Sequence, residues 1–85
     1  MKKFSYIIKD QVGIHARPAG SLVKIAKEFD VNVVLESDGK SADLKKLMAV
    51  MTLGIKKGAQ VTITVEGPDE EAAATQLEAF FITNL

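Results

Sequence analysis

Residues that can bind or transfer a phosphate are concentrated in one short segment of this chain, Gly13-Ile14-His15-Ala16-Arg17-Pro18. His15 precedes Pro18 and an apolar pattern of helical period, so it is predicted to be the N-cap of a helix whose first turn contains the proline. The amides of Ala16 and Arg17 then have no intrahelical partner and lie at the positive end of the helix. Free amides and a guanidinium form an anion site beside a nucleophilic imidazole. The segment therefore predicts a histidine that carries a phosphoryl group, with Arg17 neutralising its oxygens.

A histidine at this position can also be a polar loop residue that only precedes a helix, and the segment alone leaves both interpretations open. The chain has a single histidine, no cysteine and no glycine-rich nucleotide loop. We therefore expect no metal, no cofactor and no general base of its own. Such a chain is expected to receive and hand on a phosphoryl group while its partners catalyse the transfer.

Length and composition predict one small domain, residues 1–85, with a single hydrophobic core. The 11 Lys and Arg residues balance the 11 Asp and Glu residues, so no net field attracts the chain to nucleic acid or to anionic lipid. No apolar run is long enough to span a membrane, and the first residues do not form a signal peptide. We expect a cytoplasmic protein without direct membrane insertion.

Hydrophobic periodicity predicts the element order β-α-β-β-α-β-α. Asp38-Gly39 is a strong two-residue hairpin signal, and Gly54 is expected to end the short helix in a left-handed conformation. Asp69 is expected to cap the last helix, which has an apolar stripe. Half-buried strands that alternate with helices favour an α+β fold, an antiparallel sheet covered on one face. The predicted elements are strands 4–8, 31–36, 40–43 and 61–65 and helices 16–29, 46–53 and a last one after Asp69.

The short helix is apolar almost all round, although a helix of this length buries only one stripe. Its apolar residues are Leu47, Met48, Val50, Met51 and Leu53. At least one or two of them are therefore expected to be exposed, and exposed methionine suits a surface that fits several partners. Lys24 and Lys27 are predicted on the polar face of the first helix, and Lys45 and Lys46 flank the short helix. These lysines are interpreted as solvated charges, with an acidic partner surface as the alternative.

The sequence closely resembles HPr, the histidine-containing phosphocarrier family of the bacterial sugar phosphotransferase system. Gly13-Ile14-His15-Ala16-Arg17-Pro18-Ala19 resembles the active-site signature of that family. Leu44-Lys45-Lys46-Leu47-Met48-Ala49-Val50-Met51-Thr52-Leu53-Gly54 resembles its second signature. The resemblance extends through essentially the whole chain.

The resemblance implies an open-faced β-sandwich, a four-stranded antiparallel sheet with three helices on one face. It also implies that ring nitrogen Nδ1 of His15 receives phosphate from enzyme I, which is itself phosphorylated by phosphoenolpyruvate. His15 then passes the phosphate to IIA domains of sugar transporters. Arg17 would stabilise the phosphoryl group. Family members dock through the first and second helices and are expected to be monomers. The docking residues implied here are Ala16, Ala19, Gly20, Leu47, Met48 and Met51.

Lys46 departs from the family pattern, in which most members carry a serine that a kinase phosphorylates in many Gram-positive lineages. Lysine cannot accept that phosphate and has the opposite charge to phosphoserine. Regulation through a serine, and binding to a carbon catabolite repressor, are therefore not expected here. Lys46 also places positive charge at a helix N-terminus and removes a capping side chain.

Gly20 lies inside a predicted helix, where glycine lowers stability by about 1 kcal/mol relative to alanine.

Two other functions stay open on the sequence alone. A regulatory phosphorelay paralogue of the nitrogen-related type would use the same His15 chemistry with other partners. A binding-only module would keep the fold without phosphorylation of His15. An RNA-binding α+β domain is disfavoured because the strands lack interleaved aromatic residues and the chain lacks positive net charge.

Overall fold

The computed structural model describes all residues, 1–85, and has the predicted element order. The element boundaries differ from the prediction by one or two residues: the first helix ends before Phe29, and the first strand begins before Phe4. Lys46 precedes the second helix as its N-cap. The elements are β1 (Lys2–Ile7), α1 (Ala16–Lys27), β2 (Asn32–Ser37), β3 (Lys40–Asp43), α2 (Leu47–Thr52), β4 (Gln60–Glu66) and α3 (Glu70–Asn84).

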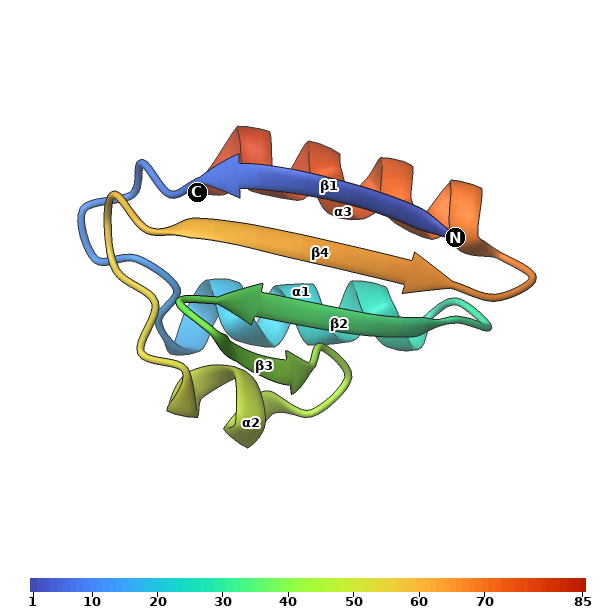
Figure 1. Cartoon of the computed structure of the whole chain (residues 1–85), viewed down its shortest axis with the longest axis horizontal. Helices are drawn as coiled ribbons and strands as arrows, with labels where there is room; N and C mark the ends of the chain where they lie inside the picture. The colour runs from blue at the N-terminus through green and yellow to red at the C-terminus, as the bar shows by residue number, and fades with distance from the viewer.

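The four strands form one antiparallel sheet in the order β1-β4-β2-β3. Helices α1 and α3 lie behind one face of this sheet, and α2 lies beside the edge strand β3 (Figure 1). The β2–β3 hairpin turns at Asp38 and Gly39, whose φ angles are 53° and 77°. Positive φ at both central residues matches the right-handed twist of the flanking strands. The predicted α+β open-faced sandwich is confirmed.

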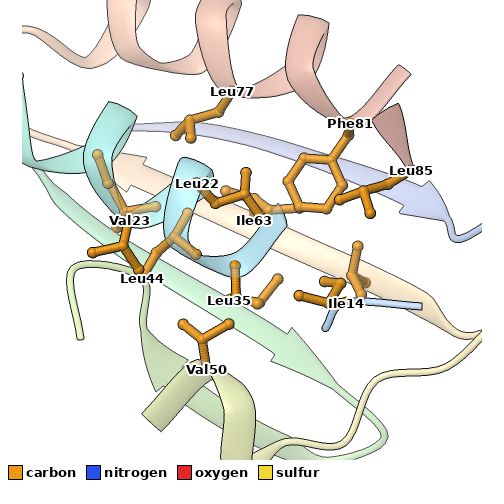
Figure 2. Close-up of a cluster of buried hydrophobic side chains, with 14 of the residues drawn as sticks. Ile14, Leu22, Val23, Leu35, Leu44, Val50, Ile63, Leu77, Phe81 and Leu85 are labelled. Carbon is orange, nitrogen blue, oxygen red and sulfur yellow. The ribbon is translucent and has the colours of Figure 1, made fainter. Parts of the chain in front are cut away.

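The core lies between the sheet and the helices, as the alternation of the strands predicts. Leu22 of α1, Ile63 of β4 and Phe81 of α3 are all fully buried and belong to one cluster (Figure 2). Phe4 and Tyr6 of β1 pack against Phe81, with ring centroids 6.0 and 5.7 Å apart. The aromatic residues of β1 therefore belong to the core side of the sheet and not to its open face.

The segment before α1 is held against the segment after α2. The amide of Ile14 donates to the carbonyl of Ile55 at 3.0 Å, and Gly13 donates to the carbonyl of Asp10 at 3.1 Å. Gly13 has φ of 79°, and a Cβ there would overlap the Ile55 carbonyl and lie 2.7 Å from Cα of Lys56. Only glycine permits both this conformation and this approach.

Asp69 occupies the predicted N-cap position of α3, but its side chain does not cap that helix. Its Oδ2 instead accepts from the amide of Asp30 at 2.8 Å and ties α3 to the loop before β2. Glu70 binds the N-terminal amino group at 2.6 Å and the amide of Gly67 at 3.2 Å. These donors hold the pKa of the Glu70 carboxyl below its ordinary value of 4.5. The stability that these two interactions contribute is therefore lost as the pH falls through the lowered pKa and the carboxylate becomes protonated.

The close approach at Gly13 yields the first prediction. Gly13→Ala should lower the free energy of unfolding by more than about 2 kcal/mol, because the methyl group combines a left-handed φ with an overlap against backbone. Urea unfolding followed by circular dichroism measures this loss.

Gly58→Ala is the matched control, because Gly58 also has positive φ, 88°, but a Cβ there meets no atom within 4 Å. The Gly58 variant should lose only about 1 kcal/mol, the cost of the backbone conformation alone. Equal losses in the two variants would show that the contact with Ile55 does not constrain Gly13.

Candidate functional site

His15 is the N-cap of α1, as the sequence predicts. Its backbone is extended, with φ of −101° and ψ of −173°, and its carbonyl accepts from the amide of Ala19 at 3.0 Å. The imidazole does not cap the helix, and no backbone carbonyl accepts from the amides of Ala16 or Arg17. The half-buried His15 therefore directly precedes two free N–H groups at the positive end of a 12-residue helix.

Three separate parts of the chain surround the histidine. They enclose a surface hollow of about 280 Å³, which we call the His15 hollow. Its polar lining combines an imidazole, a guanidinium, a hydroxyl and an amide, which can bind an oxyanion, with one carboxylate, which cannot. The lining residues are Asp10, His15, Arg17, Pro18, Ser21, Phe80 and Asn84.

A larger hollow of about 420 Å³ lies between the β2–β3 hairpin and the segment that follows α2. Lys40 and Lys56 line it, but it contains no histidine and no helix N-terminus. Size alone does not mark a site for phosphoryl chemistry, which requires a nucleophile with anion-binding groups around it. We therefore place the candidate site at the smaller His15 hollow.

Arg17 is exposed and forms no ion pair. The two ion pairs of the protein join the N-terminus to Glu70 and Lys2 to Glu71. The guanidinium therefore keeps its donors available for an anion on His15, the role for which the sequence singled it out. Guanidinium donors match phosphate oxygens in geometry and in charge.

Asp10, Ser21, Phe80 and Asn84 line the His15 hollow but were not singled out from the sequence. Ser21 had a detectable signal, because it lies four residues after Arg17 on the same helix face. The other three had none. Asp10 lies in a loop and Asn84 near the other end of the chain, and only the packing of α3 beside α1 brings Asn84 to this hollow.

The apolar surface predicted for α2 is present. Val50 is buried, whereas Leu47 and Met48 are 41% and 75% exposed, and Met51 is half-buried. Ala16 is also exposed. Val12, in the loop before His15, is 65% exposed and adds an apolar side chain that the sequence reading did not single out.

Ala19 does not belong to this surface, and its assignment as a docking residue is corrected. It has no exposed surface, because it faces the core with Leu22 and Ala26 on the inner side of α1. Gly20, the next residue, is partly exposed, and a Cβ there would meet no atom within 4 Å. Packing inside the protein therefore does not require glycine at this position.

The lysines around the two helices differ in what they contact. Lys24 and Lys27 are exposed. Nζ of Lys45 donates to the carbonyl of Phe29 at 3.1 Å, so this lysine joins the end of α1 to the segment before α2. Lys46 is exposed, and its side chain makes no capping bond at the N-terminus of α2.

No three His, Cys, Asp or Glu side chains come together in a way that could hold a metal ion. The longest helix, α3, has 15 residues, and no helix has the length and apolar character needed to cross a bilayer.

The sequence matches the family model of the PTS HPr component phosphorylation site over residues 2–83. The chain therefore belongs to the PTS HPr family, whose members are phosphocarrier proteins of the sugar phosphotransferase system and not catalytic enzymes.

Solved structures agree with this assignment. A histidine-containing phosphocarrier protein from Mycoplasma is 40% identical, with a TM-score of 0.93, over 96% of this chain and 93% of that chain. A phosphocarrier protein HPr from Bacillus anthracis is 35% identical, with a TM-score of 0.87, over 94% and 95%. An HPr dimer from Thermoanaerobacter tengcongensis is 36% identical, with a TM-score of 0.77, over 98% and 95%.

The uncapped N-terminus of α2 yields the second prediction. Lys46→Ser should raise the free energy of unfolding by about 1 kcal/mol, because serine can accept a bond from a free amide and the substitution removes positive charge from the positive helix end. Urea unfolding measures the gain. Lys57→Ser, at an exposed lysine outside the helices, is the control and should leave stability nearly unchanged; an equal gain there would contradict the capping explanation.

Proposed function

We propose that His15 accepts a phosphoryl group from phosphorylated enzyme I and donates it to IIA domains of sugar transporters. The observation that carries this proposal is the place of His15 at the N-cap of α1, directly before the free amides of Ala16 and Arg17. Family membership supplies the class of partner. The proposed phosphoryl-binding groups are these two amides and the Arg17 guanidinium.

Transfer requires a neutral ring whose Nδ1 lone pair faces the phosphorus. The bond from nitrogen to phosphorus forms as the bond from phosphorus to enzyme I breaks, and the ring proton stays on Nε2. The two amides and Arg17 then stabilise the charge that spreads over the three outer oxygens. The second transfer reverses these steps toward a IIA domain, so the carrier itself is unchanged by one cycle.

Partners dock, in this proposal, on the exposed residues of α1 and α2. Ala16, Gly20, Leu47, Met48 and Met51 provide accessible or partly accessible surface, and this surface belongs to the two helices nearest His15 in the chain. Exposed methionine adapts its shape to different partners, which suits a carrier that must bind a donor and several acceptors in turn.

Lys46 offers no hydroxyl at the N-terminus of α2, so we propose a carrier without regulation by a serine kinase at this position. Ser37 does not replace it, because its hydroxyl is buried and donates to the carbonyl of Gln60 at 3.0 Å. We also propose that the chain works in the cytoplasm as a single domain and a monomer, without nucleic acid as a partner.

A nitrogen-type phosphorelay paralogue is the alternative with the same chemistry, and it differs only in its acceptor domains. A binding-only module is the alternative without chemistry. Free amides occur at every helix N-terminus, but here they stand next to a histidine and an arginine without an ion pair. This combination supports phosphoryl transfer over the binding-only module, because together these groups can bind an anion on the ring.

The third prediction tests the site itself. After incubation with phosphoenolpyruvate and enzyme I, the wild type should gain one acid-labile phosphate and His15→Ala should gain none. Intact-mass spectrometry measures both. The variant should stay folded, because the His15 side chain makes no capping bond. Phosphorylation of His15→Ala would contradict the site, and no phosphorylation of wild type by an active enzyme I would favour the binding-only module.

The fourth prediction tests the docking surface. Met48→Asp should weaken binding to enzyme I at least about tenfold, because it places a charge in the desolvated centre of the interface. Titration calorimetry measures the affinity. Ile82→Asp is the matched control, since Ile82 is 64% exposed on α3 and should tolerate the change without loss of binding. Equal affinities of wild type and Met48→Asp would remove α2 from the interface.

A further inference from the structure

Asp10 is the one carboxylate in the lining of the His15 hollow. It lies in the loop between β1 and α1 and is only partly exposed. Arg17 lines the same hollow, yet the two side chains form no ion pair, since both ion pairs of the protein involve other carboxylates. Asp10 therefore forms no ion pair with a basic side chain.

Three hydrogen bonds hold Asp10 in place. Its Oδ1 accepts from the amide of Val12 at 2.8 Å, and its carbonyl accepts from the amide of Gly13 at 3.1 Å. Its own amide donates to the carbonyl of Leu85 at 2.8 Å. The carboxylate is thus oriented by the folded loop and not by a partner of opposite charge.

The part of the His15 hollow that α3 contributes has a negative electrostatic potential, as Asp10 has. Phe80 and Asn84 lie in the last turns of α3, where the helix presents the negative end of its dipole, and no basic residue lies in the last turn. The His15 hollow therefore combines groups that have opposite electrostatic effects on a phosphoryl group. The N-terminus of α1 and Arg17 attract a phosphoryl group on His15, whereas Asp10 and the end of α3 repel it.

We propose that Asp10 raises the phosphoryl-transfer potential of phosphorylated His15 by repelling the phosphoryl oxygens. The proposal deepens the proposed function and rests on it. A carrier that only attracted the phosphoryl group would hold it too tightly to pass it on, and a fixed negative charge in the same hollow offsets part of that attraction. Asp10 forms no bond to the phosphoryl group and takes no proton from it.

The test compares Asp10→Asn with wild type at equilibrium. The asparagine Oδ1 can still accept from the amide of Val12, so the loop bond is kept and only the charge is removed. Isotope-labelled wild type and unlabelled variant are mixed in equal amounts with limiting phosphoenolpyruvate and a trace of enzyme I, which exchanges phosphate between them. Intact-mass spectrometry gives the phosphorylated fraction of each. The variant should hold the phosphate about three- to tenfold more strongly.

Asp43→Asn is the matched control. Oδ1 of Asp43 accepts from the amide of Lys45 at 2.9 Å, the same two-residue turn as at Asp10, but Asp43 does not line the His15 hollow. Phosphate should distribute equally between Asp43→Asn and wild type. Asn84→Asp adds a negative charge to the lining and should shift phosphate toward wild type.

Equal partition between Asp10→Asn and wild type, or a shift toward wild type, would overturn the proposal, because a merely structural Asp10 can only weaken the site when it is changed. The proposed function fails separately. If wild type itself takes up no phosphate from an enzyme I that is active on another carrier, the phosphoryl site at His15 is wrong.

Discussion

Gly13 and Ile55 are far apart in the chain, and the backbone contact between their segments holds the loop that leads into α1. The absence of a side chain at Gly13 lets the loop before α1 approach the carbonyl of Ile55, which also accepts from the amide of Ile14. The buried side chain of Ile14 then anchors the same segment in the core. With these positions held, His15 can stay extended at the helix N-terminus, and the two amides that follow it remain free.

The candidate anion site at His15 depends on hydrogen-bonding and charged groups that have no partner in the free protein. The His15 side chain does not cap α1, the lysine before α2 does not cap that helix, and Arg17 has no carboxylate partner. The two uncapped helix ends cost the free protein some stability. In the proposed function, a phosphoryl group on His15 offsets this cost at α1, because the amides and the guanidinium then gain a partner that they lack in the free protein.

The surface around the site follows from the shortness of α2. Six helical residues anchor that helix through one fully buried side chain, Val50, so Leu47 and Met48 remain exposed. On α1, Ala19 is turned into the core while Gly20 beside it is partly exposed with open space around its Cα. A partner can therefore approach the backbone of α1 closely at Gly20, and the methionines of α2 can adapt to its shape.

The sequence by itself determined the element order, the hairpin at Asp38-Gly39, the alternating burial of β2 and β4 and the N-cap position of His15, because each follows from local backbone preference or from periodicity. It also located Arg17 and the excess apolar surface of α2. Only the tertiary structure decided that Ala19 is buried, that Asp69 bonds to Asp30 and not to its own helix, and that Asp10 and Asn84 share a hollow with His15. These facts depend on which segments pack together, and no local pattern encodes the contact between α3, the loop after β1 and the N-terminus of α1.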